Sequence, residues 1–433
     1  MAGLPVPMCI HLLPVDPLLH VFSFVDFRSL ARCAQVCRRF RHLAEHETLW
    51  KSHCRLYWLL EQLPAGQTWS GLFQDTYRDL GRYIAVYAPL KQTWLDLEEF
   101  LKKHCPSLMA TLKGGATEQM LHAVEEKIGR ILPEDLRCSL RIHNGQMLKG
   151  TGLMGSVAIS YHHRSECLLD VETAMQGYSQ QRTLIDSLPL TFCTRTGLTQ
   201  YIALSDVGGR TRGHVFYHSP NQTDSEICDA FLMGHHFSEW FMEYVRNVVG
   251  RKYPLIGEEI FRYMETGNVA QTGPISVSVS TAFLPEFSFI HPPHYSFSYR
   301  IRMTMDPTAS PDDSCQLARR CWYVIDERDY KQKVEGQGVV DVQIYRHPSS
   351  SKRGKTNIRG NGNLNFKPRL LMYVIIARRC SSGTKIEMYV QQRLDRLSLY
   401  PFQGIILLEL PLGGEIHSGL LLLSQWPIKS VFL

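Results

Sequence analysis

The groups in this 433-residue sequence whose types and spacing could do chemistry are glycine pairs and histidine pairs. Gly336-Gln-Gly338 has the first two glycines of a phosphate-binding loop, but Asp341 stands where the third belongs and no helix is predicted after it. Gly354-Lys355-Thr356 ends like a nucleotide-binding P-loop, but Ser349 stands where that motif requires its first glycine. We interpret the first pair as a tight turn and the second as a chance match.

The histidine pairs do not form a metal-binding pattern. His291-Pro-Pro-His294 places two imidazoles on one loop, but prolines there more often shape a turn than present a metal. His162-His163 and His235-His236 are adjacent pairs, whose side chains would face different ways. The sequence has no nucleophile–histidine–acid pattern and no zinc-protease motif. We therefore predict no catalytic site, no metal and no cofactor.

The charge of the chain lies mostly at one end. Lys and Arg number 47 against 41 Asp and Glu, a net charge of +6. Of these, 13 basic and 5 acidic residues lie in 341–433, so that segment carries +8, while residues 1–340 carry −2. A basic cluster in this tail could be a nuclear-import or nucleic-acid patch, but few aromatics are interleaved with it to stack bases. We interpret it as a solvated run and expect no nucleic-acid partner; its members are Arg346, His347, Lys352, Arg353, Lys355 and Arg359.

The composition is that of a folded intracellular protein. Hydrophobic residues make up 44% of the chain, enough for packed cores. The 12 cysteines include no CxxC pair, so we expect free and mostly buried thiols. The first residues lack the basic region of a signal peptide, and the longest apolar candidate, 399–412, is broken by Pro401, Glu409 and Pro411. We expect a cytoplasmic and nuclear protein that does not enter a membrane.

Three short helices are predicted near the N-terminus to position the first apolar residues. Asp16-Pro17 is a good helix start, and Asp26 is a second N-cap candidate. Apolar residues then recur at helical spacing up to Phe40, and a third helix is predicted around Trp50. So small a bundle is marginally stable alone, so it should pack against something else.

These residues carry a family resemblance. The segments Leu13-Pro14-Val15-Asp16-Pro17-Leu18-Leu19, Val36-Cys37-Arg38-Arg39-Phe40 and Leu49-Trp50 resemble an F-box, which would span residues 10–57. The resemblance implies docking of helices on the small Skp adaptor of cullin–RING ubiquitin ligases. The alternative is an ordinary helical cap that packs on the rest of this chain. The residues that would make or support the adaptor interface are Leu13, Pro14, Leu18, Leu30, Val36, Phe40 and Trp50.

A helical connector and an α+β domain are predicted next. Aromatic and leucine residues at helical spacing indicate a connector over 68–106. Residues 117–265 then read as helix, sheet and helix, with Gly129 as a C-cap, Asn144-Gly145 as a turn and Ser238 as an N-cap. The segments 124–129, 132–135 and 143–145 resemble the signature of the SUKH superfamily, which implies a protein-binding surface and no conserved chemistry.

The last recognisable domain is predicted to be a half-buried sheet. Ile275, Val277 and Val279 alternate with serines, and the same period of two continues over 295–304. With Leu284-Pro285-Glu286 and the strand around Trp322, this pattern resembles the ApaG domain, an immunoglobulin/fibronectin-like sandwich. A sandwich needs about seven strands in about 100 residues, and the pattern ends near residue 340. We therefore expect a half sandwich over 273–340 with an unpaired edge, followed by an atypical basic and apolar tail over 341–433.

Together these segments predict a multidomain α+β protein: an all-α F-box, an α+β SUKH-like domain and a partial all-β ApaG-like sandwich. The resemblance implies a non-catalytic substrate-recognition subunit of a Skp–cullin–F-box ubiquitin ligase, recruiting a target protein for ubiquitination and proteasomal degradation. Its partners would be the Skp adaptor, through it a cullin–RING scaffold, and a target that the sequence does not identify. The alternative function is a ligase-independent protein-binding scaffold.

Overall fold

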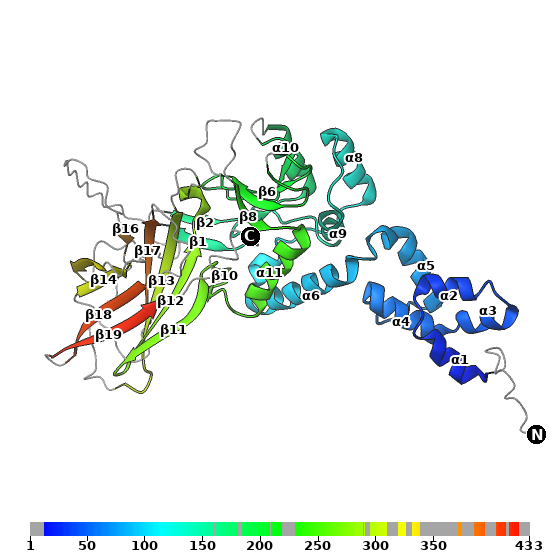
Figure 1. Ribbon diagram of the computed structural model, residues 1–433, viewed down its shortest axis with the longest axis horizontal. Helices are drawn as coiled ribbons and strands as arrows, with labels where there is room; N and C mark the ends of the chain where they lie inside the picture. Colours follow the sequence, from blue (N-terminus) through cyan, green and yellow to red (C-terminus); the bar gives the residue numbers. More distant parts are fainter. Residues whose placement is uncertain are drawn as a thin grey trace, which may run out of the picture.

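The protein, described here by a computed structural model, consists of three modules in a row (Figure 1). A helical bundle lies at one end, a helix-and-sheet module in the middle and a pair of β-sheets at the other end, and one long helix leads from the bundle into the middle module. The structure describes residues 13–159, 162–180, 184–207, 209–218, 230–288, 290, 295–309, 319–325, 331–337, 371–373, 385–394, 404–412 and 415–423.

The N-terminal bundle has four short helices where the spacing predicted three. Asp26 caps the second as predicted, accepting the backbone N–H groups of Arg28 and Ser29 at 2.8 and 2.9 Å. The predicted second helix is split, because Cys37 has extended backbone and its Sγ accepts the N–H of Phe40 to start a new helix. The helices are α1 (Val15–Phe22), α2 (Phe27–Cys33), α3 (Arg38–Ala44) and α4 (Glu47–Trp58).

The predicted cap at Asp16 is wrong. The first helix begins at Val15, with Pro14 as its N-cap. Pro17 then lies inside the first turn, where it is tolerated because the first four N–H groups of a helix have no intrahelical acceptor. The Leu18 N–H already donates to the Pro14 carbonyl at 3.3 Å.

The helical connector joins the bundle to the middle module without a long linker. Thr68 caps its first helix by accepting the N–H of Gly71 at 3.0 Å. Pro89 lies in the first turn of the next helix. The connector consists of α5 (Trp69–Leu80), the 3₁₀ turn η2 (Gly81–Tyr83), α6 (Tyr87–His104) and α7 (Pro106–Met109).

The middle module packs helices against small antiparallel sheets around the largest core of the protein. Gly129 ends its first helix at φ +66° as predicted. Gly145 has φ +65°, and a Cβ there would come within 2.4 Å of the Leu169 backbone, so only glycine fits this turn. The helices are α8 (Glu118–Ile128), α9 (Glu134–Ile142), α10 (Val171–Gln180) and α11 (Phe237–Val249).

The strands of the middle module are short. Four of them, β4, β6, β7 and β8, form one antiparallel sheet in that order. The predicted cap at Ser238 is wrong, because α11 begins at Phe237 and the Ser238 N–H donates to Asp135 on α9 at 2.8 Å. The strands are β1 (Ser156–Ile159), β2 (His162–Ser165), β3 (Cys167–Leu168), β4 (Ser187–Pro189), β5 (Thr191–Phe192), β6 (Gln200–Ala203), β7 (Val215–His218), β8 (Ala230–Gly234), β9 (Leu255–Ile256) and β10 (Glu259–Ile260).

The β-sandwich at the far end has two sheets, of order β11-β12-β13-β17-β16 and β15-β14-β18-β19. A 3₁₀ turn, η3 (Pro285–Phe287), follows the second strand. Gly336 lies inside a strand opposite Arg320, so our turn prediction is wrong for it. The strands are β11 (Met264–Thr272), β12 (Ile275–Phe283), β13 (Tyr295–Met305), β14 (Arg319–Ile325), β15 (Lys331–Gln337), β16 (Leu371–Tyr373), β17 (Lys385–Leu394), β18 (Gly404–Leu412) and β19 (Glu415–Leu423).

The strands β12 and β13 are more buried than their alternation of apolar and polar residues predicted. Ile275, Val277 and Val279 are buried as expected. On β13, however, Ser298 and Arg300 are also buried, at 2% and 4% exposure. The middle module reaches this face, since the Tyr263 hydroxyl lies 3.0 Å from Ser298 Oγ. Ser298 of β13 thus faces another module and not water.

Strands from beyond residue 340 pair with the sheets that we expected to end in an unpaired edge. β17 pairs antiparallel with β13, from Tyr295 opposite Leu394 to Thr304 opposite Lys385, and β18 pairs with β14. These strands lie in the segment that we treated as an atypical tail. The prediction failed because β18 contains the short apolar run 405–408, which is compatible with a strand although it does not alternate. The domain boundaries that we placed at residues 273 and 340 stay predictions, and the basic cluster at 346–359 lies outside the described residues.

Limited proteolysis of the purified chain tests this pairing. We expect a protected fragment that extends well beyond residue 341 and contains 385–423, because paired strand edges resist the local opening that cleavage needs. Mass spectrometry of the fragments measures where protection ends. A stable fragment that stops near residue 341 would contradict this pairing and support the predicted half sandwich.

Candidate functional site

The seven residues predicted to form the adaptor interface divide into two groups. Leu18 and Leu30 have no exposed surface and Trp50 is 8% exposed, so these three form the core of the bundle. Leu13 and Phe40 are half-buried, and Pro14 and Val36 are exposed. The structure thus separates residues that could touch a partner from residues that only support the fold.

The exposed members belong to two segments of the bundle, the one that leads into α1 and the one that leads into α3. Arg39, in the first turn of α3, donates from Nη2 to the Leu13 carbonyl at 2.5 Å. This bond brings the segment before α1 close to the start of α3, which follows Val36 directly. Val36 is 69% exposed and Val15 is 50% exposed. We call Leu13, Pro14, Val15 and Val36 the docking surface. Val15 lies in the segment that resembles an F-box, but we did not include it among the seven interface residues; its place at the first position of a short helix beside Pro14 was the available signal.

The helices beneath the docking surface are held by local contacts. The rings of Phe22 and Phe40 meet edge to face at 5.3 Å, which packs α1 on α3. Trp50 Nε1 donates to the Ala44 carbonyl at 2.8 Å, and Arg41 Nε donates to the Ala34 carbonyl at 3.2 Å. These bonds satisfy polar groups at helix ends, so the surface is presented by a preformed scaffold.

A second constellation lies between the middle module and the sandwich. Glu166 has no exposed surface, and its carboxylate accepts hydrogen bonds from four side chains. Arg164 Nη2 lies 3.2 Å away and also pairs with Glu286 of η3. The donors to Glu166 are Tyr217 Oη at 2.6 Å, Arg262 Nη2 at 2.6 Å, Gln200 Nε2 at 2.7 Å and Thr191 Oγ1 at 2.9 Å.

The electrostatics of this cluster favour the charged forms. Burial opposes ionisation of Glu166, but the guanidinium groups of Arg262 and Arg164 outweigh it and lower the pKa of the carboxyl below its ordinary value. Two arginines face two glutamates, so the charges balance. Because Glu286 lies on η3 and Arg164 on β2, the cluster joins two modules. Because all four hydrogen bonds to the Glu166 carboxylate come from side chains of the protein itself, we interpret the cluster as a structural junction.

Comparison with known families gives three matches in the predicted order. A model of F-box-like domains matches residues 10–56. A model of the SMI1 / KNR4 family (SUKH-1) matches residues 115–243, and the ApaG domain model matches residues 285–351. The fold-class prediction, an all-α F-box followed by a mixed SUKH-like region and a strand-rich ApaG region, is confirmed.

F-box only protein 3 from Homo sapiens is 48% identical to this chain over 340 residues, which cover 77% of the chain and 72% of the relative. This chain belongs to the F-box only protein 3 family. F-box protein SKIP16 from Arabidopsis thaliana is 24% identical over 375 residues, covering 75% of the chain and 84% of that protein. A crystal structure of the putative ApaA protein from Bordetella pertussis is 17% identical with a TM-score of 0.21, covering 37% and 91% of the two chains.

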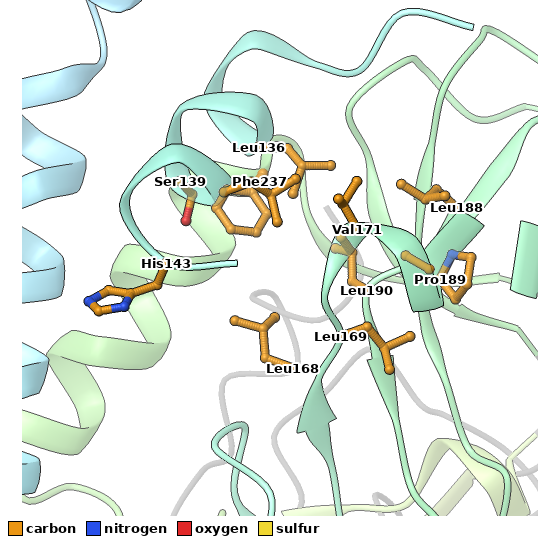
Figure 2. A pocket seen from close by; sticks show the side chains of 12 residues that line it. Leu136, Ser139, His143, Leu168, Leu169, Val171, Leu188, Pro189, Leu190 and Phe237 are labelled. Atoms are coloured by element: carbon orange, nitrogen blue, oxygen red, sulfur yellow. The ribbon is translucent and has the colours of Figure 1, made fainter. Parts of the chain in front are cut away.

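The F-box of this family member contains the docking surface, and its SUKH-like module contains a small cavity. The cavity measures about 20 Å³ and is lined mainly by leucines of α9 and the neighbouring strands (Figure 2). It has room for about one water molecule. His143 borders it, but Figure 2 shows the ring directed away from the leucines. Both ring nitrogens are occupied, by Glu98 Oε1 and the Lys113 carbonyl, each at 2.9 Å. The cavity is a packing defect and not a substrate pocket.

The buried thiols and the metal-ligating residue types give no sign of a reactive centre in the part of the chain that the structure describes. Burial raises the pKa of Cys138 to about 12 and that of Cys54 to about 11, so these thiols stay protonated. Among the described residues no group of three His, Cys, Asp or Glu side chains could hold a metal ion. His291 and His294 lie outside the described residues. Within the same ranges, no helix has the length and apolar character to cross a bilayer.

Proposed function

We propose that this chain is the substrate-recognition subunit of a Skp–cullin–F-box ubiquitin ligase. The observation that carries the proposal is the docking surface, where exposed apolar residues lie on an F-box whose own core is closed by Leu18, Leu30 and Trp50. An internal helical cap would bury such residues against the rest of the chain. Exposed apolar side chains on a preformed helical scaffold suit a partner that receives helices in an apolar groove.

The contribution of this subunit to catalysis would be proximity. The Skp adaptor would bind the docking surface and connect it to a cullin–RING scaffold. The SUKH-like and ApaG-like modules would hold a target protein, which raises the effective concentration of its lysines near the charged conjugating enzyme. The thioester chemistry would take place on other subunits, and the ubiquitinated target would be degraded by the proteasome. We expect the complex in the cytoplasm and the nucleus.

Adaptor pull-down tests the proposal. Wild-type chain should recover the Skp adaptor, and Leu13→Ala/Pro14→Ala should recover about tenfold less, because the substitution removes apolar contact at the centre of the docking surface. The chain offers a matched control in Leu63→Ala/Pro64→Ala, the same dipeptide in the exposed connection between α4 and α5. Equal recovery by both variants would defeat the receptor proposal and favour the ligase-independent scaffold.

A further inference from the structure

The F-box and the SUKH-like module share one helix. Tyr87, in the first turn of α6, packs its ring against Trp58 of the F-box at 5.5 Å. Further along the same helix, Trp94 and Leu101 have no exposed surface and belong to the core of the SUKH-like module. Figure 1 shows α6 leading from the helical end of the molecule into the middle module. Because α6 is one unbroken helix that packs into both cores, it fixes the position of one module relative to the other.

A buried polar network fixes the start of this helix from the side. Tyr83, which has no exposed surface, donates from its hydroxyl to Glu118 Oε1 at 2.6 Å and accepts Arg137 Nε at 2.8 Å. Arg137 is also fully buried and reaches Glu118 Oε2 and Glu125 Oε2, each at 2.5 Å. Tyr83 belongs to η2, which follows α5 directly, and its side chain lies in the core of the SUKH-like module, as do α8 and α9, which carry Glu118, Glu125 and Arg137. The network therefore anchors the chain just after α5 in that module.

A second contact crosses the same junction nearer the surface. Arg141 of α9 donates from Nη2 to both carboxylate oxygens of Asp79 on α5, at 2.6 and 2.7 Å. Its Nη1 is held by the Ala116 carbonyl at 2.8 Å. The side chain of Asp79 is 59% exposed, while that of Arg141 is 14% exposed. The guanidinium is therefore fixed in the SUKH-like module and presents one face to the F-box side.

We propose that Asp79, Tyr83, Glu118, Arg137 and Arg141 form a clasp that sets the angle between the F-box and the SUKH-like module. In this role Asp79 and Tyr83 are positioning residues for ubiquitin transfer, which rests on the function proposed above. Buried charged hydrogen bonds require one geometry, whereas an apolar contact tolerates many. A fixed angle would present a limited set of lysines to the conjugating enzyme, and a loose junction would spread the same lysines over a larger volume.

Distance measurement in the full chain tests the clasp directly. Genetically encoded spin labels at the exposed positions Gln35 and Glu172 report on the F-box and the SUKH-like module. Wild type should give a narrow distance distribution, and Asp79→Asn/Tyr83→Phe should broaden it about twofold. The matched control is Asp75→Asn/Tyr77→Phe, the same two types of change earlier in α5, where Asp75 pairs with Arg78 of its own helix.

Two outcomes overturn the clasp: a variant distribution as narrow as wild type, or a wild-type distribution as broad as that of the variant. Circular dichroism melting should show that both double variants remain folded. If the double variant does not fold, Asp79→Asn alone takes its place, since this carboxylate is mostly exposed and its loss leaves Tyr83 bonded to Arg137.

Reconstituted ubiquitination of the chain's own lysines gives a second readout. With adaptor, cullin, RING subunit and conjugating enzyme, wild type should be modified at few of the exposed lysines of the SUKH-like module, such as Lys127 and Lys149. The clasp variant should bind the adaptor equally well but spread modification over more lysines, with a rate at the preferred site about fivefold lower. An unchanged site pattern counts against the positioning role. If neither protein binds the adaptor, the proposed function fails, while the distance distributions still decide the clasp.

Discussion

Replacing Glu166 by glutamine is expected to lower the free energy of unfolding by about 3–5 kcal/mol. The carboxylate accepts four hydrogen bonds at both oxygens. An amide would turn a donor toward Tyr217 and Arg262 or toward Gln200 and Thr191, so two donors would face each other. The substitution would also leave Arg164 and Arg262 with one anion between them, in a site where Glu166 and Arg164 are buried away from the solvent.

The same variant should change the pH dependence of stability. Because the pKa of Glu166 is lower in the folded protein than its ordinary value of 4.5, the folded state holds this proton less strongly than the unfolded chain. The resulting stabilisation is present above the unfolded pKa and is lost as pH falls through the folded pKa. Wild type should therefore lose stability on acidification more steeply than Glu166→Gln.

Denaturant unfolding between pH 3 and 7, with hydrogen exchange of β6 and β7 as the local readout, measures both effects. Glu172→Gln is the matched control, an exposed glutamate in the first turn of α10 that should change stability by less than about 0.5 kcal/mol. If Glu166→Gln and Glu172→Gln have the same stability at neutral pH, the buried ion network does not hold the two modules together.

Charging the docking surface is expected to weaken adaptor binding strongly without unfolding the F-box. Val15→Asp/Val36→Asp should weaken adaptor affinity about 100-fold, because an unpaired carboxylate would be desolvated in an apolar interface. Both side chains are at least half exposed, at 50% and 69%, so the free energy of unfolding should change by less than about 0.5 kcal/mol. Calorimetric titration with purified adaptor and thermal melting measure the two quantities.

Two comparisons separate contact from folding. Val249→Asp, at a 41% exposed valine that ends α11, should leave adaptor affinity unchanged. Leu18→Ala should instead destabilise the F-box by about 2–5 kcal/mol and weaken binding only through unfolding, because Leu18 is fully buried. Adaptor affinity equal to wild type in Val15→Asp/Val36→Asp would place the adaptor elsewhere on the chain.

Local signals made much of this fold predictable. Asp26 caps α2 and Gly129 ends α8 as expected, because capping depends on residues within one helical turn. The turn at Gly145 follows from a backbone position that only glycine can occupy. The order of the three modules and their family membership are likewise written in short motifs, which the family comparisons match.

Exposure and long-range pairing were decided by the tertiary structure. A sequence motif does not show that Leu18 is buried in a core while Val36 is exposed to water, because both are apolar residues at helical spacing. Arg164 and Glu286 meet across 122 residues of sequence, and β13 pairs with a strand about which the alternation pattern said nothing. Both kinds of contact arise when separate elements pack, so the sequence determined which modules form, and their packing determined which surfaces remain open.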